Sequence, residues 1–152
     1  MAETNRFMSL FATAKDYFKS DYIAYTELDI ARSMFLHWIR GNEQSEIQFL
    51  ETPYNSHSVC SSVIHSGGTV TICNLEDITY GAQCPFMLAE KLNSYLGAPV
   101  YGDERCVGAF EVFCRSKRLW SPSDKRNVRT CADLVQAINT PAAQRLVAVS
   151  RT

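Results

Sequence analysis

The chain has 152 residues and a formal net charge of −1, with 46% hydrophobic and 20% charged residues. A chain of this length forms about one domain, and the composition is typical of a globular protein rather than a disordered one. The charge balance leaves no excess of lysine and arginine to neutralise phosphates, which argues against nucleic acid as a direct partner. No apolar run approaches the ~20 residues that cross a bilayer, and the N-terminus lacks the pattern of a secretory signal. We therefore expect a cytoplasmic protein that does not act at a membrane.

A helix is predicted over residues 4–19, with Thr4 as its cap. Its apolar residues recur at helical spacing and form one face, which is typical of a helix packed on other structure. Two interpretations of that face remain open: it covers the sheet of its own domain, or it pairs with a second copy of the chain.

Strands dominate the next part of the chain. Two runs of aromatic and branched residues, 22–28 and 33–40, flank a turn at 29–32 and predict an antiparallel hairpin. Alternation of polar and apolar residues over 46–51 predicts a half-buried third strand.

The second half alternates helices and strands. The predicted elements are a helix over 56–66 that stops at Gly67 and Gly68, a strand over 69–73, a loop over 74–83, a helix over 85–93, and strands over 94–101 and 106–115 joined by a turn at 102–104. Glycines inside strands mark a bend or a close approach of two backbones, and Gly97 and Gly108 are such residues. Pro99 indicates an edge or a break in the hydrogen-bond ladder. Ser121 and Pro122 begin a last helix, and Pro141 ends it.

This order of elements predicts one α+β domain over residues 5–139, followed by a tail over 140–152. Strands in hairpins with helices at both chain ends favour an antiparallel sheet of about six strands, with helices on its faces and at both termini.

Five stretches in order resemble the motifs of a GAF domain. They are VCSSVIHSGG (59–68), TVTICNLED (69–77), SYLGAPV (94–100), GDERCVGAFEV (102–112) and LWSPSD (119–124). The resemblance implies a small sensory or regulatory module that binds a small molecule between the sheet and the helices and loops over one face. It further implies signal transduction through the terminal helices, a homodimer, and a signalling protein as a possible partner.

The resemblance places a ligand pocket over the segment 74–96 and the strands that face it. Candidate lining residues are Trp38, Tyr80, Gln83, Cys84, Phe86, Met87, Tyr95, Glu111 and Phe113. Glu111 is the most informative of them, because it lies among apolar neighbours. It either faces solvent on the pleat or is a partnered carboxylate in the pocket.

The six cysteines allow an enzymatic alternative. Free methionine-(R)-sulfoxide reductases are GAF proteins with thiol chemistry, and Cys60 and Cys84 resemble two of their cysteine positions. The chain departs from that family where Pro85 replaces an aspartate and where Glu111 alone remains of the strand carboxylates. Cys84 is also comparable in position to a bilin-attachment cysteine, but Pro85 stands where a histidine usually follows.

The remaining chemistries have little support in the sequence. No C-x-x-C pair and no closely spaced Cys/His set predicts a metal site, and no cofactor is indicated. Histidine can ligate haem or an iron–sulfur cluster, but nothing beyond residue type suggests that role for His57 and His65. The signature of cyclic-nucleotide-binding GAF domains is absent. One further alternative remains: a module that binds no ligand and only contacts protein partners or a second copy of the chain.

Overall fold

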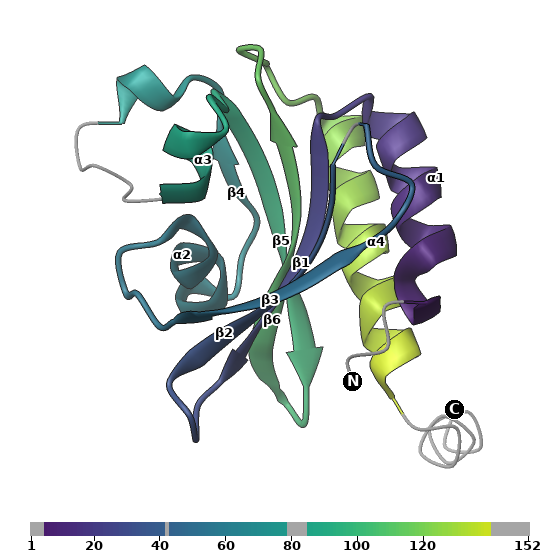
Figure 1. Cartoon of the computed structure of the whole chain (residues 1–152), viewed down its shortest axis with the longest axis vertical. Helices are drawn as coiled ribbons and strands as arrows, with labels where there is room; N and C mark the ends of the chain where they lie inside the picture. The colour runs from purple at the N-terminus through teal and green to yellow at the C-terminus, as the bar shows by residue number, and fades with distance from the viewer. Residues whose placement is uncertain (1–4, 42, 79–84, 141–152) are drawn as a thin grey trace.

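A computed structural model describes residues 5–41, 43–78 and 85–140. Its centre is a six-stranded antiparallel sheet with the strand order β3-β2-β1-β6-β5-β4. Helices α1 and α4 lie side by side over one face of the sheet, and α2 and α3 lie over the other (Figure 1). The strands are β1 (Tyr22–Asp29), β2 (Met34–Gly41), β3 (Gln48–Pro53), β4 (Val70–Ile72), β5 (Ser94–Gly102) and β6 (Arg105–Cys114). The helices are η1 (Asn5–Phe7), α1 (Met8–Phe18), α2 (Val59–Ser66), η2 (Leu75–Asp77), α3 (Pro85–Ala89) and α4 (Pro122–Asn139).

The predicted order of elements and the α+β class are confirmed. Two helices are shorter than predicted. Helix α2 begins at Val59, after its cap Ser58, rather than at residue 56. Helix α3 ends at Ala89 rather than near residue 93, because Lys91 has a φ of 55° and turns the chain into β5. A short 3-10 helix, η2, forms inside the predicted loop, where the Asn74 side chain accepts from the backbone N–H of Glu76. The predicted cap Thr4 and the predicted stop Pro141 lie outside the described residues.

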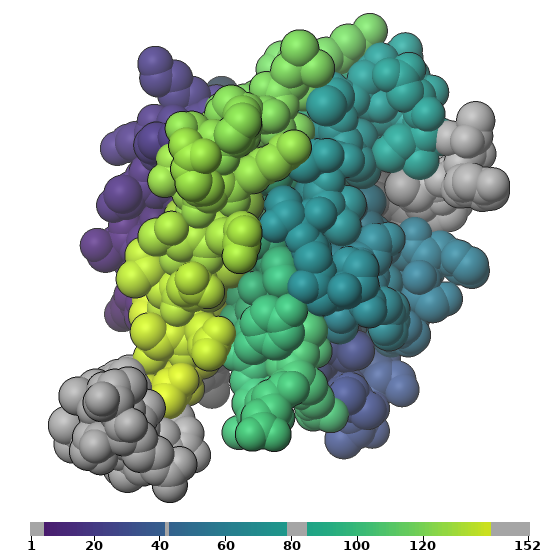
Figure 2. Space-filling view, turned by 180° about the vertical axis from the view of Figure 1, so that it is seen from behind, coloured from purple at the N-terminus to yellow at the C-terminus, as the bar shows by residue number. Residues whose placement is uncertain are grey.

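Local sequence signals explain where the later helices begin and end. Ser58 caps α2, and Gly67, at a φ of 64°, ends it in the left-handed conformation that glycine adopts without strain. Ser121 begins α4 with a full capping box, in which Ser121 and Asp124 each bond the other's backbone N–H. Figure 2 shows α4 running along the surface of the molecule beside the β5–β6 hairpin.

The sheet separates two apolar cores. Tyr25, Phe110 and Val112 point toward α1 and α4, where they join Phe7, Phe11 and the apolar face of α4. Their neighbours Ala24 and Phe113 point the other way, toward α2 and α3. Residues on β1 and β6 therefore contact the terminal helices and the opposite layer alternately, as the two-residue period of a strand requires. The apolar face predicted for the first helix covers the sheet of its own domain.

No helix among the described residues combines the length and the apolar character needed to cross a membrane.

Candidate functional site

A cavity of about 310 Å³ lies between the sheet and the layer formed by α2 and α3. Strands β1, β2, β3 and β6 supply its floor, and residues from the start of α2 and α3 complete its wall. Its surface is mainly apolar, with a few polar groups among the apolar ones. The lining residues are Ala24, Thr26, Phe35, His37, Ile39, Leu50, Thr52, Pro53, Asn55, Ser58, Cys60, Pro85, Phe86, Glu111 and Phe113. Apolar walls with a few placed polar groups are typical of small-molecule sites.

A continuous chain of hydrogen bonds crosses the floor of this cavity. The Tyr95 hydroxyl donates to Glu111 Oε2 at 2.6 Å, and the Thr26 hydroxyl donates to Glu111 Oε1 at 2.7 Å. Thr26 Oγ1 also contacts His37 Nδ1 at 2.9 Å. His37 Nε2 in turn contacts Thr52 Oγ1 at 2.7 Å. Five neighbouring strands, β5, β6, β1, β2 and β3, thus contribute one polar side chain each to this chain of hydrogen bonds.

The direction of each hydrogen bond follows from the charge of Glu111. An ionised carboxylate can only accept hydrogen bonds, so the Thr26 and Tyr95 hydroxyls are both donors to it. The Thr26 oxygen then accepts from a protonated Nδ1 of His37, and Nε2 accepts from the Thr52 hydroxyl. A neutral His37 with its proton on Nδ1 therefore satisfies every group when Glu111 is ionised. A proton on Oε1 of Glu111 would instead be donated to Thr26, and the bonds toward Thr52 would then run in the opposite direction, with the His37 proton on Nε2.

Burial sets the ionisation of both groups. Burial raises the pKa of Glu111 from 4.5 to about 7, although the bonds from Thr26 and Tyr95 act in the opposite direction. Burial also lowers the pKa of His37 from 6.5 to about 4, so His37 is neutral at physiological pH. Near neutral pH Glu111 can therefore exchange its proton while His37 stays uncharged.

Gly97 explains how Tyr95 reaches the carboxylate. Gly97 is the cross-strand partner of Glu111, and the Tyr95 side chain bends over it on the same face of β5. A Cβ at position 97 would lie 2.3 Å from the Tyr95 hydroxyl oxygen. The glycine predicted to mark a close approach thus makes room for the hydroxyl that binds Glu111.

The structure brings together part of the predicted site. Phe86, Glu111 and Phe113 line the cavity, and so does Cys60. Tyr95 does not line the cavity but donates a hydrogen bond to Glu111, and Met87 is fully buried in the same apolar core. Tyr80, Gln83 and Cys84 lie outside the described residues.

Trp38 is not part of this cavity. It lies on the opposite face of the sheet, stacked on Tyr25 with ring centroids 5.4 Å apart and in edge contact with Phe7. The reason is the strand period: His37 and Ile39 face the cavity, so Trp38 between them faces the other core, where it meets Phe7 of η1.

Thr26, His37 and Thr52 also line the cavity, and the sequence analysis does not predict them. A signal for the first two was present, because each is a polar residue inside a run of aromatic and branched residues. Such a residue is buried and bonded when it alternates with the apolar face of its strand.

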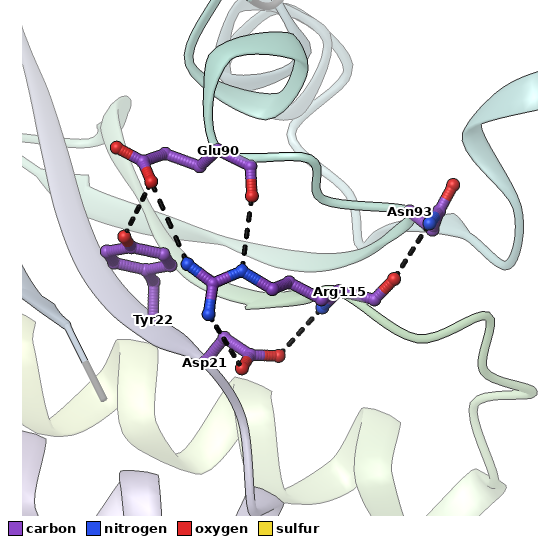
Figure 3. A network of polar contacts seen from close by, with 5 residues as sticks. All are labelled: Asp21, Tyr22, Glu90, Asn93 and Arg115. Carbon is purple, nitrogen blue, oxygen red and sulfur yellow. Dashed lines mark hydrogen bonds and ion pairs between the residues drawn. The ribbon is translucent and has the colours of Figure 1, made fainter. Parts of the chain in front are cut away.

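A polar network outside the cavity fixes α3 to the sheet (Figure 3). Arg115, just after β6, donates from Nε to the Glu90 carbonyl and pairs with the Glu90 and Asp21 carboxylates at 3.8 and 3.7 Å. The Tyr22 hydroxyl donates to Glu90 at 2.9 Å, and the Asn93 side chain donates to the Arg115 carbonyl at 2.7 Å. These contacts hold the residue that follows α3, and with it the cavity wall at Phe86.

The described residues contain no group of three or more His, Cys, Asp or Glu placed to hold a metal ion. His65 bonds the Tyr54 hydroxyl at 2.6 Å, and neither it nor His57 lines the cavity.

These features define an α+β domain whose helices α2 and α3 roof a ligand-sized cavity on one face of a sheet. The sequence matches the GAF domain family over residues 7–138, and the chain belongs to that family. None of the curated proteins matches the sequence significantly.

Solved structures share the fold at low sequence identity. The GAF domain of a phosphoenolpyruvate-protein phosphotransferase from Acinetobacter is 18% identical, with a TM-score of 0.72 over 90% of this chain and 83% of that one. A free methionine-R-sulfoxide reductase from Neisseria meningitidis in complex with its substrate is also 18% identical, with a TM-score of 0.67 over 90% and 78%. The PixJ GAF domain of Thermosynechococcus elongatus, in its blue-light absorbing form, is 13% identical, with a TM-score of 0.67 over 96% and 90%.

Proposed function

We propose that this GAF domain is a cytoplasmic sensory module that binds a small, largely apolar molecule in the cavity beneath α2 and α3. The observation that carries the proposal is the combination of an apolar cavity with the bonded groups Glu111, Thr26 and His37 on its floor. Buried polar groups are expensive to desolvate, and they commonly orient a ligand where they line a cavity.

The same strands offer a route from the cavity to the terminal helices. Glu111 lines the cavity, whereas its neighbours Phe110 and Val112 pack under α1 and α4. A ligand that prefers one placement of β1 and β6 would shift the arrangement of those helices. Tyr17 of α1 and Leu134 of α4 are 49% and 48% exposed, and we propose that this outer surface forms a homodimer or contacts a signalling partner.

Filling the cavity is expected to abolish ligand binding. Ala24 is buried, lines the cavity and is small, so Ala24→Leu places three more carbon atoms inside it. A native mass spectrum of the wild-type protein is expected to show an added mass that is lost on denaturation, and the spectrum of Ala24→Leu is expected to show the bare chain.

Ala31→Leu is the matched control, because Ala31 is exposed in the β1–β2 turn. It should retain the added mass. A wild-type spectrum without added mass, or an added mass retained in Ala24→Leu, would contradict ligand binding in this cavity. The same spectra report whether the protein is a dimer.

A thiol-dependent reductase is the second candidate function. Cys60 lines the cavity, with its sulfur 3.2 Å from the Ser58 hydroxyl, and two of the similar folds are free methionine sulfoxide reductases. Reduction of free methionine sulfoxide by the wild-type protein, abolished in Cys60→Ser, would favour this candidate over the sensor.

A further inference from the structure

We propose that the cavity selects a small organic cation, an ammonium group on an apolar body about the size of a phenyl ring, and that the cation pairs with Glu111. This inference rests on the proposed ligand-binding function and specifies the chemistry of the ligand.

The first support is the charge of the cavity. Among its described lining residues Glu111 is the only acid, and no lysine or arginine is present. Arg115, a basic group beside α3, does not line the cavity and pairs with Glu90 and Asp21 (Figure 3). A buried carboxylate without a cationic partner is unfavourable when ionised, and a bound cation would provide that partner.

The second support is unused hydrogen-bonding capacity. An ionised carboxylate offers about four acceptor positions, and the described contacts of Glu111 use one on each oxygen, for Tyr95 and for Thr26. An ammonium group brings three donors. The remaining acceptor positions of the carboxylate suit such donors, and they do not suit a ligand that only accepts.

The third support is the lining around the carboxylate. The aromatic rings of Phe35, Phe86 and Phe113 line the same cavity. Aromatic faces attract cations and also bury an apolar body, so one wall serves both parts of an arylalkyl amine. The volume of about 310 Å³ lies at the lower end of ligand pockets, which favours a single-ring body.

Three probes of one shape and different charge test the inference. Phenethylamine, 2-phenylethanol and phenylacetate share a phenylethyl-sized body and differ in carrying a positive, a neutral and a negative group. We expect calorimetric titration at about pH 8 to give phenethylamine an affinity at least about tenfold above 2-phenylethanol, and phenylacetate no measurable binding.

Glu111→Gln is expected to remove the preference for the amine while still binding the alcohol. Glu46→Gln, on the exposed segment before β3, is the matched control and should keep the wild-type preference. Thermal unfolding of each variant shows whether it is folded.

The amine preference of the wild-type protein should also shrink from about pH 8 to about pH 6 as Glu111 gains its proton. Among the described residues, the other titratable groups at this site are His37 and Cys60, which line the cavity, and Tyr95, which bonds Glu111. Helix α3 contributes only Pro85 and Phe86.

The outcomes separate this inference from the function on which it rests. Equal affinity for amine and alcohol, tighter binding of phenylacetate, or an unchanged preference in Glu111→Gln overturns the cationic ligand and leaves a ligand-binding cavity. Failure of all three probes to bind also overturns the inference. The proposed function is then decided separately by the native mass spectra of wild type and Ala24→Leu.

Discussion

Glu111→Gln and His37→Gln are expected to change the pH dependence of stability in opposite directions, each by about 3 kcal/mol. The pKa of Glu111 is raised from 4.5 to about 7, so the folded protein binds more protons than the unfolded chain between these values. Stability contributed by Glu111 is therefore lost as the pH rises from 4.5 to 7. The glutamine variant lacks this loss, and its free energy of unfolding should rise relative to wild type over that range.

His37 has the reverse sign. Its pKa is lowered from 6.5 to about 4, so the unfolded chain binds more protons between these values, and folding becomes less favourable as the pH falls. His37→Gln removes that loss, and its free energy of unfolding should fall relative to wild type as the pH rises from 4 to 6.5. Urea denaturation of the three proteins at a series of pH values gives both differences. Variant curves that run parallel to wild type would contradict the burial of these groups.

Gly108→Ala is expected to destabilise the domain by about 3 kcal/mol. Gly108 lies in β6 opposite Glu27 of β1, and a Cβ there would come within 2.4 Å of the Thr26 backbone oxygen and 2.8 Å of the Tyr25 ring. The backbone of a central strand cannot move away cheaply, since β1 is paired on both sides.

Gly102→Ala is the control for this prediction. A Cβ at Gly102, in the same β5–β6 hairpin, meets only Val107 methyl groups at 3.5 and 3.6 Å. Its effect on the free energy of unfolding should stay within about 0.5 kcal/mol. Similar losses of unfolding free energy in the two variants would show that the close approach at Gly108 does not cause the destabilisation.

Much of the fold could be predicted from the sequence because local signals and side-chain periodicity agree. The cap at Ser121 and the strand glycines Gly97 and Gly108 have the roles expected of them. Pro99 lies in β5 beyond the last residue paired with β4, where one side of the strand is an edge. The division into a domain over 5–139 and a tail over 140–152 stays a prediction.

The site could be predicted only in part. The resemblance to GAF domains predicts Glu111 and Phe113 as lining residues, and both line the cavity, but the partners of Glu111 depend on strand register. Thr26 lies opposite His37 in the pairing of β1 with β2, and no local pattern fixes that pairing from sequence. The resemblance to GAF domains includes Trp38 in the pocket, whereas the alternation along β2 places it on the other face of the sheet, against Phe7 of η1.

Protein-observed NMR with a fragment mixture of arylalkyl amines tests the central claim most directly, because shifted amide signals locate the bound fragment on the protein. We predict that binding shifts the amide signals of Thr26, His37 and Glu111 on the cavity floor, and that smaller shifts extend to Val128 and Val135 of α4 across the sheet. Shifts confined to residues away from the cavity, with the floor signals unchanged, would contradict a ligand site between the sheet and helices α2 and α3.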